Sequence, residues 1–215
     1  MLKADLHMHS NYSRDCSMPL EQIIQICQDR GINCVALTDH GQTEGALRLR
    51  EIAPFKVIIG QEVLTPDGEI MGLFLKETVP AGLSPADAVA RIKEQGGLAG
   101  VPHPFDRLRG LKRSALENLL PQLDFIEVLN ARSLLKRDNV DARRAVAEHR
   151  LLATAGSDAH TAGEIGRVYV EMDEFSDKQE FLTSLAKGKV TGHLSSPFVH
   201  FHTSIAKVTQ KFRKK

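Results

Sequence analysis

The sequence predicts an α/β protein whose strands close toward a barrel. Short β-rich runs alternate with helical patterns along the chain, which is typical of parallel α/β folds. The number of strands is nearer that of a barrel than that of a three-layer sheet. At 215 residues the chain can bury a sizeable core, and no stretch rich in Pro, Gly or Ser divides it.

The first half of the chain contains five β-rich runs and three helical patterns. The strands are expected at residues 2–7, 33–39, 56–65, 69–75 and 98–101. The helices are expected from Pro19 to Gly31, over residues 43–53, and from Ser84 to Gly96. The sequence Pro66-Asp67-Gly68 separates two of the strands and predicts a hairpin turn.

The second half continues the alternation. Strands are expected at residues 124–130, 151–156 and 168–172, with a long helix over residues 131–149 between the first two. A final helical stretch is expected from Thr203. The segments 114–117 and 176–179 each pair a Ser with a Glu or Gln three residues later, and we interpret them as capping boxes at helix starts.

Composition and the N-terminus favour a cytoplasmic protein without a membrane segment. No apolar run approaches the roughly 18 residues that a membrane span needs. The N-terminus lacks the charged start and apolar stretch of a signal peptide. The net charge of +1 predicts no general attraction to nucleic acid, and the basic segment 207–215 is expected to be a solvated tail. The three cysteines are expected in the core.

Histidine and carboxylate residues coincide with five of the predicted strands or follow them. They are His7, His9, Asp39, His40, Glu62, His103, Asp158 and His160. In an α/β barrel the C-terminal ends of the strands share one face, where active sites are found. The sequence therefore predicts that these side chains meet at one rim.

The spacing of these residues indicates a metal site. Side chains at positions i and i+2 of a strand point the same way, so His7 and His9 can hold one ion, and Asp158 and His160 repeat the pattern. Imidazole nitrogens combined with carboxylate oxygens suit Zn, Mn or Fe. Glu62 lies in an apolar strand, where a carboxylate without a partner is costly, and it can bridge two ions. Each residue alone has a capping or hydrogen-bonding alternative, but the combination predicts metal binding.

Four motifs resemble those of the polymerase and histidinol phosphatase (PHP) superfamily of metal-dependent phosphoesterases. They are DLHMHS, LTDHG, GQE with VPHPF, and GSDAH, in the family's order from residue 5 to residue 160. The resemblance implies a single PHP domain over residues 1–215, folded as a distorted TIM-like (β/α)7 barrel. It also implies two or three divalent transition metal ions, Zn, Mn or Fe, at the C-terminal ends of the strands.

The resemblance further implies which residues bind each ion. His7, His9, Glu62 and Asp158 would hold the first ion, and Glu62 would bridge to a second ion that also binds His103. No motif of a serine or cysteine nucleophile competes with this centre. In the expected reaction a water that bridges two ions loses its proton near neutral pH and attacks phosphorus in line.

A third ion would take His40 and His160. Two further ligand positions depart from the commonest family pattern, because Asp15 and Glu69 stand where many members have histidine. Oxygen ligands at these positions lower the affinity for Zn and shift the preference toward Mn or Fe. The alternative for Glu69 is a solvated glutamate beside the hairpin. If the third ion is absent, His40 or His160 is expected to supply the leaving-group proton, so both are counted as catalytic together with Glu62 and Asp158.

Three arginines follow predicted strand ends and are candidates for binding the substrate phosphate. They are Arg107, Arg109 and Arg132, with Arg132 and Arg107 ranked first, and a solvated loop residue is the alternative for each.

Four polar residues near the motifs are expected to support the metal ligands from outside. Glu127 and Asn130 end a predicted strand and are expected to support histidine ligands. Asp39 is expected to orient His40 or another imidazole, and Asp5 is expected to support the same centre.

The sequence thus predicts a metal-dependent phosphoric ester hydrolase that acts on a small-molecule or nucleotide phosphomonoester. One alternative is an exonuclease or oligonucleotide phosphatase, in which the basic tail helps to hold nucleic acid and activity weakens steeply with salt. Another is a metal-bearing regulatory module without catalysis, against which the intact ligand set argues.

Overall fold

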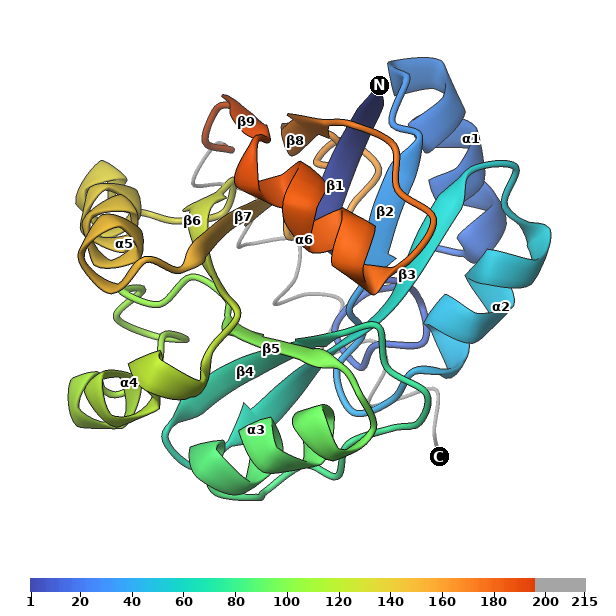
Figure 1. The fold of residues 1–215 in the computed structure, drawn as a ribbon. Coiled ribbons are helices and arrows are strands. Elements are labelled where there is room, and N and C mark those ends of the chain that lie inside the picture. Colours follow the sequence, from blue (N-terminus) through green and yellow to red (C-terminus); the bar gives the residue numbers. More distant parts are fainter. Residues whose placement is uncertain (196–215) are drawn as a thin grey trace.

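A curved sheet of nine strands nearly closes into a barrel in residues 1–195, the part of the chain that the computed structural model describes (Figure 1). The strand order is β7-β6-β5-β4-β3-β2-β1-β8-β9. The strands are β1 (Leu2–Met8), β2 (Cys34–Leu37), β3 (Lys56–Thr65), β4 (Gly68–Leu73), β5 (Leu98–Val101), β6 (Phe125–Asn130), β7 (Leu152–Gly156), β8 (Val168–Met172) and β9 (Lys189–Gly192). The predicted barrel class is confirmed.

The sheet is mixed: the alternation of strands and helices predicted a parallel α/β architecture, and the turn at Pro66-Asp67-Gly68 predicted one hairpin within it. Strands β1, β2 and β3 are parallel, and so are β5, β6 and β7. Strand β4 is antiparallel to both of its neighbours, and the two-residue turn at Pro66 and Asp67 joins it to β3 as a hairpin. Strand β8 is antiparallel to β1 and to β9, a short strand that the sequence did not reveal.

The described residues form six α-helices around the sheet, and α6 is drawn in front of it in Figure 1. They are α1 (Leu20–Arg30), α2 (Glu44–Ile52), α3 (Pro85–Glu94), α4 (Arg113–Leu119), α5 (Lys136–His149) and α6 (Lys178–Ala186), with a short 3-10 turn at Leu120–Gln122. Gly31 ends α1 as predicted, in the left-handed conformation with φ of 67°. Within residues 1–195, no helix is both long and apolar enough to cross a membrane.

Three predicted helix starts need correction. Helix α4 begins at Arg113, and Ser114 makes no capping bond, so the first capping box is wrong. At α6 the box is displaced by one residue, because Asp177 accepts from the Glu180 N–H and the Glu180 carboxylate accepts from the Ser176 N–H. Helix α5 begins at residue 136 instead of 131, because a loop occupies residues 131–135. The helix expected from Thr203 and the basic segment 207–215 lie outside the described residues.

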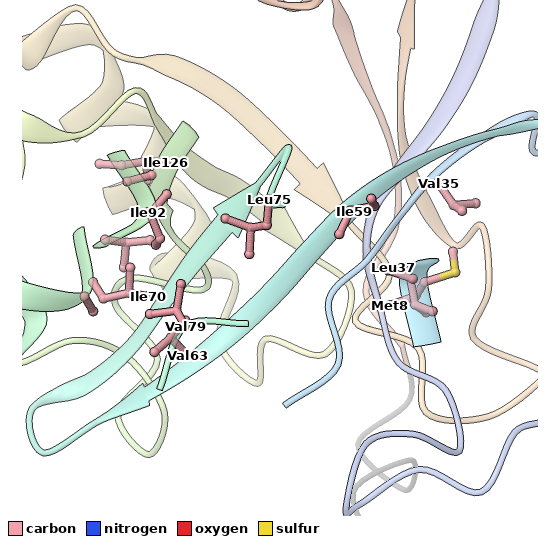
Figure 2. Close-up of a cluster of buried hydrophobic side chains, with 14 of the residues drawn as sticks. Met8, Val35, Leu37, Ile59, Val63, Ile70, Leu75, Val79, Ile92 and Ile126 are labelled. Atoms are coloured by element: carbon pink, nitrogen blue, oxygen red, sulfur yellow. The ribbon is translucent and has the colours of Figure 1, made fainter. Parts of the chain in front are cut away.

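Alternating side chains along the strands divide the core into two clusters. Val35 and Leu37 of β2 belong to the outer cluster, between sheet and helices, which Figure 2 shows. Cys34 and Ala36 of the same strand belong to the inner cluster. This inner cluster contains residues from the N-terminal ends of the parallel strands, and Phe181 and Leu185 of α6 pack into it. The period of two residues therefore fills one end of the barrel with apolar side chains.

The barrel is drawn together where the chain after β7 meets β1. The Asp158 N–H donates to the His7 carbonyl at 2.7 Å, and the His9 N–H donates to the Ala159 carbonyl at 3.0 Å. Gly156 permits this approach, because a Cβ there would lie 2.4 Å from the Cβ of His7 and 2.5 Å from its backbone nitrogen. The contact places two predicted motifs, at opposite ends of the sequence, side by side.

Candidate metal centre

The nine residues predicted as metal ligands meet in one buried cluster. The cluster contains four overlapping groups, and within each group the ligand atoms lie within 4.8 Å of one another. The groups are His7, His9 and Glu62; His7, His103 and Asp158; His40, Glu62 and Glu69; and His9, Asp15, His40 and His160. The residues come from the C-terminal ends of parallel strands, from the hairpin strands β3 and β4, and from the loop after β1.

Glu62 of β3 lies at the middle of the cluster. Its Oε2 atom is 3.3 Å from Nε2 of His7, 3.3 Å from Nε2 of His9 and 3.5 Å from Nε2 of His40. Its Oε1 atom is 2.9 Å from Nε2 of His103. Each oxygen thus faces a different set of imidazoles, which is the arrangement expected of a carboxylate that bridges two ions.

Asp158 presents one oxygen to the cluster and is anchored through the other. Oδ2 accepts hydrogen bonds from the Arg109 guanidinium and, at 3.3 Å, from the Asn130 side chain. Oδ1 is buried without a hydrogen-bond donor and lies 3.6 Å from Nε2 of His7 and 3.4 Å from Nε2 of His9. A buried carboxylate oxygen without a donor is costly unless a cation binds it, so this geometry fits a divalent ion.

Two residues of the cluster have backbone conformations that L-amino acids rarely adopt. Asp158 has φ of 52° and His103 has φ of 29°. Such strain costs roughly 1–3 kcal/mol per residue and is concentrated at functional sites. Surrounding contacts hold both conformations, since the Asp158 N–H binds the His7 carbonyl and the His103 N–H binds the Glu127 carboxylate at 2.8 Å.

Asp15 and Glu69 both lie within the cluster. Asp15 Oδ2 is 3.5 Å from Nε2 of His40 and 3.5 Å from Nε2 of His160. Glu69 Oε2 is 3.3 Å from Nε2 of His103. The solvated alternative for Glu69 does not describe this structure, because only 13% of the side chain is exposed.

The dense packing of charges shifts the pKa values of the cluster in opposite directions. Burial opposes ionisation of Glu62 and Asp158, but the neighbouring histidines, with Arg109 for Asp158, outweigh it and hold both pKa values well below normal. Burial and the Glu62 carboxylate raise the pKa of Glu69 to about 9. Burial, then the charge of His9, lower the pKa of His160 to about 4. The pKa values of His7 and His9, by contrast, are raised, that of His9 to about 10, because the neighbouring carboxylates, Glu62 and Asp158 among them, outweigh the effect of burial. Ionised Glu62 and Asp158 and neutral His160 are donors that suit a transition metal ion.

Glu127 holds two of the candidate ligands from outside, as the sequence predicted. Its Oε1 atom lies 3.0 Å from Nδ1 of His7, and its Oε2 atom accepts from the His103 N–H. The Asn130 side chain donates to the same Oε2 at 2.9 Å and also to Asp158. A carboxylate on the far nitrogen fixes the orientation of an imidazole and raises its basicity.

The Glu127→Gln variant is expected to bind metal about 10- to 100-fold more weakly, because its amide cannot replace the charge beside His7. Titration against a competing chelator measures this affinity. Glu77→Gln, at an exposed position, is the control and should match the unaltered protein. Equal affinity in the Glu127 and Glu77 variants would show that the contact with His7 does not support metal binding.

Asp5 and Asp39 accept hydrogen bonds from loop residues and not from the imidazoles of the candidate ligands. Asp39 was expected to orient His40 or another histidine, but its carboxylate accepts from the N–H and the hydroxyl of Ser10, each at 2.6 Å. Asp5 accepts from the backbone N–H groups of Ser157 and Gly166, at 2.8 and 2.9 Å. Both residues therefore position the loops that carry the ligands.

The three candidate arginines have different surroundings. The structure does not support the order in which the sequence analysis ranked them as phosphate-binding residues. Arg109, which was ranked last, reaches Asp158 directly and also binds Asp106 at 3.2 Å. Arg132 is buried, where it contacts Nδ1 of His160 and lies 3.4 Å from the Glu164 carboxylate. Arg107 is exposed to solvent.

Two buried carboxylates of the centre were missed by the sequence analysis. Asp106 pairs with Arg109, and Glu164 accepts from the His160 N–H at 3.1 Å and from the N–H and hydroxyl of Thr161. Their signal was weak, because both lie in polar loops where a carboxylate is usually solvated. Only their positions shortly after VPHPF and GSDAH could have singled them out.

Known proteins resemble this chain in part of its sequence and in its fold. A family model described as PHP-associated matches residues 136–190. A protein of Methanocaldococcus jannaschii without an assigned function is 38% identical over 143 residues, which cover 60% of this chain and 82% of that protein. The crystal structure of a two-domain protein from Bacteroides vulgatus, which contains a predicted PHP-like metal-dependent phosphoesterase, superimposes with a TM-score of 0.73. That match covers 89% of this chain and 65% of the other, at 20% identity.

The chain thus matches a PHP-associated model over part of its length, and its fold is similar to that of a protein that contains a predicted PHP-like phosphoesterase. It is also similar, over a shorter stretch, to a phosphoribosyl 1,2-cyclic phosphate 1,2-diphosphodiesterase of Eggerthella lenta. The two are 36% identical over 86 residues, which cover 36% of this chain and 32% of that enzyme.

Proposed function

We propose that this protein is a metal-dependent phosphoesterase that hydrolyses a small-molecule or nucleotide phosphomonoester. The observation that carries the proposal is Glu62, whose two oxygens face separate sets of imidazoles, with the donor-free oxygen of Asp158 beside them. The names of the Bacteroides vulgatus and Eggerthella lenta proteins support ester hydrolysis at phosphorus.

The residues would hold two or three divalent ions, Zn, Mn or Fe, in the groups described above. Such ions lower the pKa of water and neutralise charge on phosphate oxygens. Oxygen ligands at Asp15 and Glu69 favour Mn or Fe over Zn at the sites that contain them.

The protein's own side chains position the ester. Arg109 carries five N–H groups, of which Asp158 and Asp106 occupy some, and 26% of its side chain is exposed. It is therefore the arginine best placed to contact a phosphate oxygen next to the ions. Arg132 and Glu164, both buried, fix the ring and backbone of His160. A neutral imidazole at His160 fits a metal ligand, so His40 and His160 are assigned to the third ion first.

Turnover on a panel of phosphomonoesters, nucleotides and short RNA tests the proposal, with Mn, Zn or Fe supplied. We expect hydrolysis of small phosphomonoesters that a chelator abolishes and added metal restores. Because few phosphates contact the protein, the rate should depend weakly on salt. Metal binding without turnover on any ester would favour a regulatory module, and hydrolysis of RNA alone with steep salt dependence would favour a nuclease.

A further inference from the structure

A buried serine lies between two members of one of the four ligand groups. That group, which we call the third-ion group, consists of His9, Asp15, His40 and His160. In the loop after β1, the hydroxyl of Ser13 donates to Oδ1 of Asp15 at 2.8 Å. The same hydroxyl oxygen accepts from the backbone N–H of His40 at 3.3 Å. Only 1% of Ser13 is exposed, so solvent hardly competes with either bond.

The two partners of Ser13 fix the direction of its hydroxyl. A backbone N–H can only donate and a carboxylate can only accept, so the hydroxyl proton must point at Asp15. Backbone bonds also hold the serine itself. Its N–H donates to the Ser10 carbonyl at 2.9 Å, and its carbonyl accepts from the Cys16 N–H at 3.4 Å. The hydroxyl therefore has one orientation, on a turn that is held at both ends.

The bond from Ser13 decides which oxygen of Asp15 faces the third-ion group. Oδ1 is engaged by the hydroxyl, whereas Oδ2 lies 3.5 Å from Nε2 of His40 and 3.5 Å from Nε2 of His160. The terminal torsion of an aspartate is broad, so a carboxylate without a partner has no fixed orientation. A carboxylate can also bind an ion through one oxygen or through both. Ser13 thus holds Asp15 as a ligand that offers one oxygen.

The loop after β1 is tied to the end of β2 at two points. Ser10 donates to the Asp39 carboxylate through both its N–H and its hydroxyl, each at 2.6 Å. Ser13 makes the second tie, through the N–H of His40. Because the first tie does not involve Ser13, loss of the Ser13 hydroxyl should leave the loop in place and release the Asp15 carboxylate.

We propose that Ser13 is a positioning residue for the third ion: its hydroxyl holds Asp15 so that Oδ2 binds the ion, and without the hydroxyl the ion binds more weakly. This inference rests on the metal centre of the phosphoesterase function proposed above. It assigns a different role to Ser13 than to the ligands, because Ser13 acts on the ion only through Asp15.

Native mass spectrometry of the protein loaded with Mn²⁺ tests the inference, because it counts bound ions without any turnover. The unaltered protein should bind three ions. In Ser13→Ala the affinity for the third ion should fall about 10- to 100-fold, the usual effect of removing an outer support, while two ions stay bound. Ser184→Ala is the matched control, since it removes a hydroxyl of similar burial in α6, where Ser184 donates to the Asp173 carbonyl. It should keep all three ions.

A double-mutant comparison tests whether Ser13 acts through Asp15. Asp15→Ala removes the ligand itself and should weaken the third ion more than Ser13→Ala does. In the Asp15→Ala background, the further change Ser13→Ala should have no additional effect on Mn²⁺ affinity, which titration against a chelator measures. An additional loss of affinity in that background would show that Ser13 has a general structural role, and the inference would be wrong.

The number of bound ions separates the inference from the proposed function. Three ions bound with unchanged affinity in Ser13→Ala would overturn the inference and leave the phosphoesterase function standing. Equal weakening of all three ions would also overturn it, because the hydroxyl would then support the whole centre. If the unaltered protein binds two ions, the inference alone fails. If it binds none, the inference and the proposed function fail together.

Discussion

Asp158→Asn is expected to lose bound metal and to hydrolyse phosphate esters at least ~100-fold more slowly than the unaltered protein. The change replaces Oδ1 or Oδ2 by an amide nitrogen, which cannot bind a cation, and removes the charge that pairs with Arg109. Loss of an outer support alone costs 10- to 100-fold, so loss of a direct ligand should cost more. Metal content by mass spectrometry and turnover on a phosphomonoester measure the two effects.

Asparagine is the suitable substitution because it tolerates the left-handed conformation at this position, where φ is 52°. The fold should therefore survive, and the circular dichroism spectrum should be unchanged. Asp29→Asn, on the exposed face of α1, serves as the control and should keep its metal and activity. Full metal content and turnover in Asp158→Asn would show that Asp158 is not a ligand.

Gly156→Ala should destabilise the protein by about 1–3 kcal/mol, the usual cost of an added group in a packed site. The new methyl group would lie 2.4 Å from the Cβ of His7, and atoms of the His7 backbone leave it no room. Because β1 must move away, His7 should also separate from Asp158, and metal affinity should fall with stability. Urea unfolding and metal titration measure both quantities.

Gly163→Ala is the matched control, since a Cβ there meets no atom within 4 Å. It changes the same residue type in the loop that follows His160, and should leave both measurements unaltered. A Gly156→Ala protein with unchanged stability and metal affinity would contradict the close approach of the two chain segments.

The ligand cluster could be predicted because its residues follow the ends of strands, and the period of a strand is visible in the sequence. His7, His9, His40 and His103 all lie at or just beyond such ends. The antiparallel pairing of β3 with β4 also followed from a local turn, but the direction of β8 could not be predicted in the same way. The pairing of β8 with β1 joins segments more than 160 residues apart, and no local pattern records it.

The ranking of the arginines shows a second limit of local patterns. Arg107 and Arg109 follow the same motif, and only the turn built on Asp106 decides which of them faces Asp158. Likewise, the hydrogen-bond donor to Asp39 is Ser10, which lies next to it in space through the pairing of β1 with β2. The residues that support a metal centre depend on tertiary contacts, which the local sequence does not show. The ligands themselves can be predicted, because their spacing follows the strand.

The inner apolar cluster closes the end of the barrel opposite Glu62, and this limits the side from which a small molecule can reach the centre. Phe181 of α6 packs edge-to-face against Phe74 and Phe175, with ring centroids 5.0 and 5.1 Å away. Together with the inner cluster these rings fill the end opposite Glu62 in the described part of the chain. On the proposed function, the ester would therefore reach the centre from the side where the segments after β5 and β7 carry His103 and Asp158.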